Sequence, residues 1–246
     1  MNKIFEFSSP NLDDLAKKYN IERLKIEKML ESAQSTLEPI RKVFQVIEDS
    51  IPQIIQVTRN GVGPLVTKDG PVWQYDFILN DRWEKYSVLI SGKMDIKTFQ
   101  PIFNLDEELH IRIDSGCETG QIFNDMTCDC LDQLNIGSSE IAKNQGILIH
   151  IPNQDGRGMG LPFKLATLYL QEGLGLDTVE SASLLASGGV IDVRTYAGVI
   201  AIMKFFEIPV EAKLNFHSNN PHKREVFEAN GYPTFAFPKD GFLKSL

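Results

Sequence analysis

The chain lacks the features that mark an exported or membrane-bound protein. It has only three cysteines among 246 residues, an odd number that argues against a disulfide framework. No apolar run approaches the ~18 residues of a membrane helix, and Met1–Phe7 lacks the apolar stretch of a signal peptide. We therefore expect a cytoplasmic protein without a membrane segment.

The chain also lacks an excess of positive charge. Lys and Arg total 25 against 33 Asp and Glu, which gives a net charge of −8 at pH 7. This balance argues against binding to polymeric nucleic acid or to anionic membranes, which a basic surface would favour. A small nucleotide is compatible with it, because such a ligand needs only a local group of donors. The hydrophobic content of 42% is ordinary for a soluble globular protein.

All three cysteines lie in one stretch, Ser115–Gln133. Ten residues separate Cys117 from Cys128, and one residue separates Cys128 from Cys130. Structural zinc usually has four protein ligands, whereas catalytic zinc has three and keeps a position open for water. The stretch holds no fourth cysteine and no histidine, so it predicts a three-thiolate zinc site of the catalytic kind. The alternative is three free buried thiols, since a free cysteine packs as a small hydrophobe.

The N-terminal part of the chain has a helical pattern. Apolar residues recur at steps of three or four between residues 11 and 49, which predicts amphipathic helices. Asn11 can cap the first helix, and Pro39 is expected in the first turn of a separate helix. Further on, the residue types change to those of strands. We predict a helical segment at residues 1–51, used for packing or dimerisation, and a second domain at residues 52–246.

The second domain reads first as strands and then as strands alternating with helices. The expected strands are 54–58, 72–79, 86–90, 110–114, 146–151 and 213–217. The expected helices are 131–144, 162–172, 195–207 and 223–230, and turns are expected at Asn60-Gly61 and Asp69–Pro71. This order predicts an α/β fold with a mixed sheet and flanking helices.

A glycine-rich loop follows the strand expected at 146–151. It carries Gly156, Gly158 and Gly160 around the charged residues Asp155 and Arg157. Glycines let backbone N–H groups come close to an anion or a flat base. Such a loop is a weak signal alone, but a strand before it and a helix after it favour a binding role.

Two further loops carry polar and charged groups. Ser187-Gly188-Gly189 leads to Asp192 and Arg194, which flank one residue and would face the same side of an extended segment. Ser218–Arg224 places hydroxyl, amide and cationic groups at a helix N-terminus, a natural phosphate site. Each also has an ordinary explanation: Asp-x-Arg can be a plain ion pair, and Ser or Asn can be a plain helix cap.

Taken together, the motifs resemble the GTP cyclohydrolase II family. They are Cys-x₁₀-Cys-x-Cys, Gln-Asp-Gly-Arg-Gly-x-Gly-Leu, Asp-x-Arg and Ser-Asn-Asn-Pro-x-Lys, in this order. The resemblance covers about residues 55–240. That family opens the imidazole ring of GTP, releases formate and pyrophosphate, and makes a pyrimidine precursor of riboflavin. The resemblance implies its fold, its activity and a homodimer.

The resemblance also implies a role for each matching residue. Cys117, Cys128 and Cys130 would bind one Zn²⁺ per chain, which would activate water for attack on the purine C8. Asp192 would accept a proton, and Arg194 would attack the α-phosphorus. Mg²⁺ would arrive with the phosphates of the substrate. The residues that would hold the nucleotide are Arg112, Ser115, Gln133, Asp155, Gly156, Arg157, Thr178, Ser218 and Lys223.

The sequence departs from the family at several site positions. Where the family has Arg-Val-His-Ser-Glu-Cys, this chain has Asp114 for the histidine and Gly116 for the glutamate. Asp155 replaces the glutamate of the glycine-rich loop and is one methylene shorter. The catalytic tyrosine aligns with Leu168; the neighbouring Tyr169 is rotated by about 100° on a helix and cannot simply substitute for it.

Three hypotheses of function follow. We favour a divergent GTP cyclohydrolase II, in which Leu168 could leave the formamide on the product. The second is a GTP cyclohydrolase II-like enzyme of uracil catabolism that acts on a uridine nucleotide, UMP or UTP. The third is a non-catalytic zinc protein that binds a nucleotide. Intact Asp192, Arg194 and all three cysteines favour an enzyme over this third hypothesis.

Overall fold

The computed structural model describes residues 10–82, 84–186, 189–218 and 220–233. The chain divides into two compact units, with the boundary between Glu38 and Pro39. Three residues of the Ser187–Gly189 and Ser218–Arg224 loops, namely Ser187, Gly188 and Asn219, lie outside the described residues. Within the described ranges, no helix is long and apolar enough to cross a membrane.

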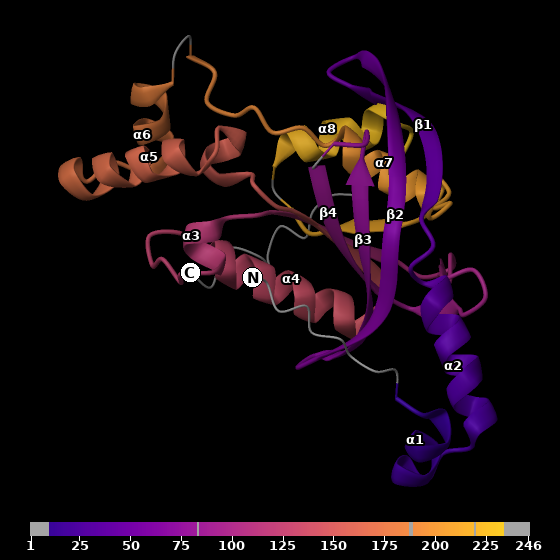
Figure 1. The fold of residues 1–246 in the computed structure, drawn as a ribbon. Coiled ribbons are helices and arrows are strands. Elements are labelled where there is room, and N and C mark those ends of the chain that lie inside the picture. The colour runs from indigo at the N-terminus through magenta and orange to yellow at the C-terminus, as the bar shows by residue number, and fades with distance from the viewer. Residues whose placement is uncertain (1–9, 83, 187–188, 219, 234–246) are drawn as a thin grey trace. The chain divides into compact units, whose positions relative to one another are not determined.

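The N-terminal unit consists of two helices, α1 (Leu12–Tyr19) and α2 (Arg23–Ser35) (Figure 1). Asn11 caps α1 as predicted, because its side chain accepts a hydrogen bond from the backbone N–H of Asp13 at 2.8 Å. Arg23 joins the helices by an ion pair to Asp13 at 3.0 Å. None of the residues of α1 and α2 is buried, so the two helices enclose no core of their own.

The helix predicted after Pro39 is wrong. Ile40–Glu48 forms strand β1, which pairs antiparallel with β2 (Ile51–Thr67). The apolar residues at 40, 43, 44 and 47 fit a helical spacing, but burial along β1 alternates instead, with Val46 and Glu48 buried and Val43 exposed. Asp49 and Ser50 make the hairpin turn with φ of 52° and 62°, as a type I′ turn requires.

The turn predicted at Asn60-Gly61 is also wrong. β2 continues through these residues, with a shift of register between Arg59 and Gly61 where it pairs with β3 (Gly70–Leu79). An Asn-Gly pair inside a strand can mark a bulge as well as a hairpin. The turn predicted at Asp69–Pro71 lies where β2 and β3 join, as expected.

Seven strands of the described residues form one sheet in the order β1-β2-β3-β4-β8-β7-β9. The remaining members are β4 (Glu84–Ser91), β7 (Leu109–Ser115), β8 (Gly146–Ile151) and β9 (Leu214–Phe216). β7 runs parallel to β8 and β9, while the other pairs are antiparallel. The predicted mixed sheet is therefore confirmed. A short hairpin, β5 (Lys93–Asp95) and β6 (Gln100–Ile102), was not predicted.

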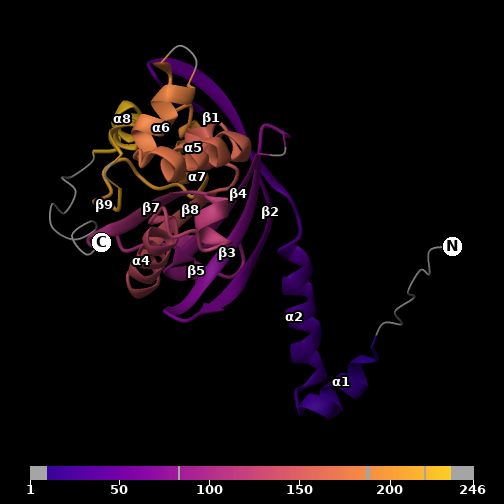
Figure 2. The same ribbon diagram turned by 90° about the vertical axis from the view of Figure 1, so that its left-hand side faces the viewer.

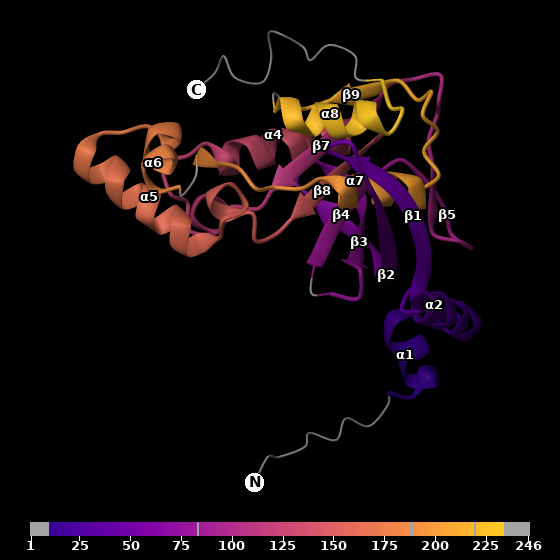
Figure 3. The ribbon, with the colours of Figure 1, turned by 90° about the horizontal axis from the view of Figure 1, so that it is seen from above.

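The helices of this unit are α3 (Glu118–Gln121), α4 (Cys130–Lys143), α5 (Leu161–Leu174), α6 (Thr178–Leu185), α7 (Ala197–Phe205) and α8 (Pro221–Ala229). A 3₁₀ turn, η1 (Asp155–Gly158), precedes α5. Four of the six helices were predicted; α3 and α6 were not. α5 and α6 lie side by side beyond the end of the sheet (Figures 1 and 3).

The main core lies between the sheet and α7. The apolar residues of α7 are fully buried, and Phe205 meets Phe77 of β3 edge-on with ring centroids 5.1 Å apart. α4 packs on the opposite face, where Gly137 faces the side chain of Arg112 from β7. Ile111 and Ile113, the neighbours of Arg112, point into the main core, as the two-residue alternation of a strand requires. Arg112 is thus on the face that carries the site.

Gly198 marks the closest approach of α7 to the sheet. A Cβ atom at this position would lie 2.4 Å from Cδ1 of Leu79 and 2.6 Å from the hydroxyl oxygen of Tyr86. The helical Gly173 in α5 has no heavy atom within 4 Å of such a Cβ. These two glycines separate the effect of helix propensity from that of packing.

We expect Gly198→Ala to destabilise the protein, although alanine is the better helix former. Overpacking of a core costs about 1–3 kcal/mol, which outweighs a propensity gain of about 1 kcal/mol. Urea unfolding should show a lower midpoint for Gly198→Ala and an unchanged or higher one for Gly173→Ala. A Gly198→Ala protein as stable as the Gly173→Ala control would contradict this packing argument.

Candidate functional site

The ends of three parallel strands bring the motif loops together. β9, β7 and β8 are neighbours, and each leads at its carboxyl end into one of the loops singled out in the sequence (Figure 2). The cysteine stretch follows β7, the glycine-rich loop follows β8, and the Ser218 loop follows β9. Loops at the carboxyl ends of parallel strands meet at one edge of the sheet, a common place for a binding site.

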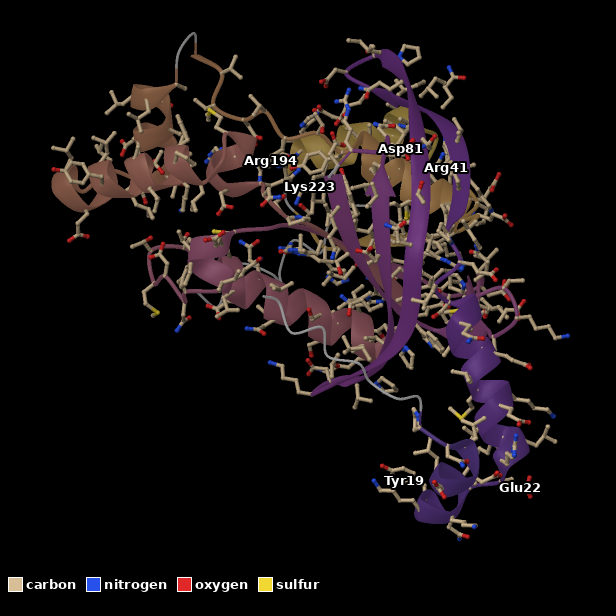
Figure 4. The ribbon with its side chains drawn as sticks, viewed as in Figure 1. Tyr19, Glu22, Arg41, Asp81, Arg194 and Lys223 are labelled. Carbon is tan, nitrogen blue, oxygen red and sulfur yellow. The ribbon has the colours of Figure 1, made fainter. Side chains whose placement is uncertain are left out.

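A cavity of about 350 Å³ lies at this edge. Most of the predicted site residues line it: Arg112, Ser115, Cys117, Cys128, Cys130, Gln133, Asp155, Gly156, Arg157, Thr178, Arg194 and Lys223. Asp192 and Ser218 do not line it, although Asp192 pairs with Arg194. Figure 4 shows Arg194 and Lys223 close to each other between α5 and the strands.

The three cysteines form a compact group that could hold a metal ion. Their sulfur atoms lie within 4.8 Å of one another. Hydrogen bonds from the Cys128 and Cys130 thiols lower the pKa of Cys117, and the Cys117 sulfur in turn raises the pKa of Cys130. Metal binding requires thiolates, so a cation held by these three sulfurs would displace the thiol protons.

Because Gly120 of α3 has no side chain, the cysteine side chains can lie directly beside it. A Cβ atom on Gly120 would lie 2.6 Å from the sulfur of Cys128 and 3.1 Å from Cβ of Cys130. The backbone of α3 therefore approaches the sulfurs more closely than any other residue type would allow. Such a close approach of the backbone to the sulfur atoms suits a binding site for a small ion.

A buried carboxylate connects the cysteine stretch to the glycine-rich loop. Asp155 accepts a hydrogen bond from the backbone N–H of Glu118 at 2.8 Å, next to Cys117. Burial raises the pKa of Asp155. One oxygen of this carboxylate thus positions the backbone beside a cysteine.

The glycine-rich loop turns through left-handed backbone conformations. Gly156, Arg157 and Gly158 have φ of 58°, 59° and 86°. A Cβ atom on Gly158 would lie 3.1 Å from the backbone nitrogen of Arg194, so glycine permits the close approach of the two segments. The backbone N–H of Val193 donates to the carbonyl oxygen of Arg157 at 3.0 Å and joins them.

Asp192 and Arg194 face the same side, as their spacing predicts. Nε of Arg194 donates to Oδ1 of Asp192 at 2.9 Å, and Nη2 pairs with Oδ2. Burial alone would raise the pKa of Asp192, but the hydrogen bonds and charge of Arg194 outweigh it and lower that pKa. The carboxylate is therefore ionised near neutral pH, and it fixes the direction of the guanidinium group.

Arg112 and Lys223 are buried cations of the cavity, and Arg112 also lies 3.9 Å from the carboxylate of Asp114. Arg112 donates to the carbonyl of His217 at 2.9 Å and to the side chain of Gln133 at 3.1 Å. Lys223 donates to the carbonyl of Ile113 at 2.9 Å. Burial, followed by repulsion from Arg112 and Arg194, lowers the pKa of Lys223 to about 7. A neutral carbonyl orients the charge of protonated Lys223 without cancelling it, so Lys223 can still attract an anion.

The Ser218 loop is built as a helix cap. Asn220 caps α8, because its side chain accepts hydrogen bonds from the backbone N–H groups of His222 at 2.9 Å and Lys223 at 3.4 Å. Ser218 in turn accepts a hydrogen bond from the backbone N–H of Asn220 at 3.2 Å. Among the described residues of this motif, Lys223 alone lines the cavity.

Two departures from the family pattern, Asp114 and Gly116, line the cavity. Asp114 accepts hydrogen bonds from Gln121 at 3.0 Å and contacts His150 at 2.6 Å. Gly116 has no room for a side chain, since its Cβ would lie 2.9 Å from the backbone of Ile151 and Pro152. These contacts explain how Asp114 and Gly116 are accommodated in this structure.

Helix α5 contributes residues that sequence reasoning missed. Lys164, Thr167 and Gln171 line the cavity at a spacing of three and four residues. This polar spacing on a predicted helix was the available signal. Leu168 is half-buried and Tyr169 is 81% exposed, and neither of them lines the cavity.

Thr178 reaches the cavity from α6, which the sequence analysis did not predict. Asp177 and Glu180 form a capping box at its start, in which each side chain accepts a hydrogen bond from the other's backbone N–H. The pattern Asp-x-x-Glu resembles the Ser/Thr-x-x-Glu signature of a helix start and could have revealed this helix.

We expect the affinity of the cavity for an anion to fall as pH rises through about 7. The protonated fraction of Lys223 decreases across this range because its pKa is lowered to about 7. Sulfate is a suitable probe, since its own charge is constant there. Calorimetric titration should show binding about tenfold weaker at pH 8 than at pH 6. In Lys223→Met the binding should be weak at both pH values; an unchanged pH dependence in that variant would refute the assignment.

Comparison with known proteins agrees with this site. The family model described as GTP cyclohydrolase II matches residues 66–233. The riboflavin biosynthesis protein RibBA of Parabacteroides distasonis is 31% identical over 224 residues, which cover 90% of this chain and 47% of that protein. RibBA of Staphylococcus saprophyticus is 29% identical over 205 residues, which cover 80% of this chain and 48% of that protein.

A shorter relative is covered more fully. The GTP cyclohydrolase-2 of Picrophilus torridus is 35% identical over 154 residues, which cover 62% of this chain and 71% of that protein. The chain spans about half the length of the RibBA relatives. The family model covers well over half of this chain and includes every predicted site residue. The chain therefore belongs to the GTP cyclohydrolase II family.

Proposed function

We propose that this protein is a zinc-dependent cyclohydrolase that opens the imidazole ring of GTP. The observation that carries the proposal is one cavity that combines three clustered thiols with Arg157, Arg194 and Lys223. A group of thiols suits a soft metal, and the cations suit the phosphates of a nucleotide. The names of the relatives, RibBA and GTP cyclohydrolase-2, support the same activity.

The donor set fits zinc. Cys117, Cys128 and Cys130 would hold it, and among the described residues no fourth cysteine, histidine or carboxylate joins their cluster. Three protein ligands with an open position are typical of catalytic zinc. Zinc held by these residues would supply a Lewis acid that activates water for ring opening.

The remaining residues would bind, orient and move protons. Arg157, Arg194 and Lys223 would bind the phosphates, which would bring Mg²⁺ with them. Asp192 holds the guanidinium of Arg194 in a fixed direction, toward the α-phosphorus in the proposed complex. Since Asp192 is ionised near neutral pH, it can also accept a proton released during ring opening.

The product would keep its formyl group if a tyrosine hydroxyl is required to remove it. Leu168 takes the place of the family tyrosine, and Tyr169 lies outside the cavity with 81% of its surface exposed. Helix α5 instead presents Lys164, Thr167 and Gln171 to the cavity. We propose ring opening with pyrophosphate release and retention of the formamide.

A second candidate is opening of the uracil ring of UMP or UTP. It is favoured by the two altered residues that line the cavity before Cys117, namely Asp114 and Gly116. They change the shape and charge of the floor where a base would lie. A smaller pyrimidine would make different contacts with these residues.

A substrate screen on zinc-loaded protein decides between the candidates. GTP, GMP, UTP, UMP and uridine would each be incubated and followed by ultraviolet absorption and mass spectrometry. We expect loss of the guanine chromophore from GTP alone, with a product mass that retains the formyl group. Loss of the uracil chromophore with GTP untouched would establish the second candidate instead. No turnover of any compound would indicate a binding protein.

We expect Cys128→Ser to lose zinc and ring opening together. A serine hydroxyl replaces the thiolate that zinc needs, so metal analysis should show well below one zinc per chain and turnover should fall by about 10³-fold or more. Thr127→Ala is the matched control, because it removes only the hydrogen bond to Asp125 next to the same cysteine. The mechanism would be wrong if the metal-free Cys128→Ser protein still turned GTP over at the wild-type rate.

A further inference from the structure

Glu48 is a buried carboxyl group that none of the site motifs includes. It lies at the end of β1, before the residues matched by the family model, and only 2% of its surface is exposed. Its Oε1 accepts a hydrogen bond from the backbone N–H of Tyr196 at 2.5 Å, and its Oε2 accepts one from Ala197 at 3.2 Å. A buried carboxylate normally needs such partners, because burying a charge without them is costly.

These two N–H groups belong to the start of α7. The first amides of a helix have no partner within it, and the helix dipole favours a negative charge there. Tyr196 offers no side-chain cap of its own, so Glu48 supplies the cap from a strand 148 residues earlier in the chain. The position of this helix end therefore depends on β1.

The same carboxylate lies beside the start of α8. Nε2 of His222 is 3.8 Å from Oε1 of Glu48 and 3.4 Å from Oδ1 of Asp49. The ring of Tyr196 lies between the two helix starts, with its centroid 5.4 Å from that of His222 and 5.4 Å from Nζ of Lys223. Glu48 and Tyr196 thus connect the N-terminal ends of α7 and α8.

Each of these helix starts carries one cation of the cavity. Arg194 lies two residues before Tyr196, and Lys223 directly follows His222. The two cations lie next to each other in Figure 4. A shift of either helix end would change the spacing between two groups that face the same anion.

We propose that Glu48 is a positioning residue that holds Arg194 and Lys223 at the spacing required by the phosphates of the substrate. It touches neither the cavity nor the substrate, and it acts through the starts of α7 and α8. The phosphate part of this inference rests on the proposed function, but the anchoring of the helix ends does not.

Other contacts would keep β1 in place without the Glu48 charge. Asn230 at the end of α8 exchanges two hydrogen bonds with the backbone of Ile47, at 2.9 Å and 2.7 Å. Lys204 near the end of α7 donates to the carbonyl oxygen of Gln45 at 2.7 Å. Glu48→Gln, which keeps the shape of the side chain, should therefore fold.

Two measurements on Glu48→Gln test the proposal. Hydrogen–deuterium exchange should show the amides of Tyr196 and Ala197 exchanging about tenfold faster, because a charged acceptor and one of two hydrogen bonds are lost. In the same folded protein, kcat with GTP should fall about tenfold or more through misplacement of the cations. The zinc content should remain one per chain, since the cysteine loop is not altered.

Lys204→Met is the matched control, because it removes a contact of β1 at the opposite end of α7. It should lower the melting temperature while leaving kcat and the exchange of Tyr196 and Ala197 at wild-type values. If Glu48→Gln behaved like this control, Glu48 would have only a structural role and the proposal would be refuted. If Glu48→Gln did not fold, Glu48→Asp would take its place, with the same expected changes and the same refuting outcome.

The test also separates this inference from the proposed function. If the wild-type protein did not turn over GTP, the proposed function would fail while the exchange experiment would still decide the anchoring. Sulfate affinity would then replace kcat as the second measurement, with binding about tenfold weaker expected for Glu48→Gln. Unchanged sulfate affinity together with unchanged exchange would refute the anchoring itself.

Discussion

The parallel pairing of β7 with β8 and β9 is the constraint on which the site depends. In this pairing Asp114 lies opposite His150 and Ser115 opposite Ile151, so both strands end at the same level. The cysteine stretch and the glycine-rich loop then begin side by side, and the hydrogen bond from the Glu118 amide to Asp155 fixes their spacing. The pairing of the backbone strands thus brings together residues that are far apart in the sequence.

The charged residues of the cavity and their partners decide what the loops at this edge of the sheet can bind. One cation of the cavity, Lys223, is held by a neutral partner, the carbonyl oxygen of Ile113. Arg194, by contrast, is held by the carboxylate of Asp192. A site of this kind orients one cation by an ion pair and leaves another ready to pair with the ligand. Burial strengthens both effects, since charges interact more strongly where water is excluded.

Local patterns in the sequence predicted the parts of the fold and site that depend on local order. The strands around the site, the helix α4 and the cysteine cluster follow from short motifs whose spacing carries the information. β1 could not be predicted in this way, because Ile40, Val43, Phe44 and Ile47 fit a helix as well as a hairpin strand. The role of Glu48 was also hidden, since its partner Tyr196 lies 148 residues further along the chain. The bulge at Asn60-Gly61 depends on the neighbouring strand in the same way.

Gly116 has a consequence for how this chain relates to its family by descent. The glutamate of the family pattern would not fit here without a shift of the backbone, because a Cβ atom would lie 2.9 Å from the backbone of Ile151 and Pro152. Ile151 ends β8, and Pro152 follows it toward the glycine-rich loop. A glutamate at position 116 and the present path of the chain after β8 are therefore not compatible with each other.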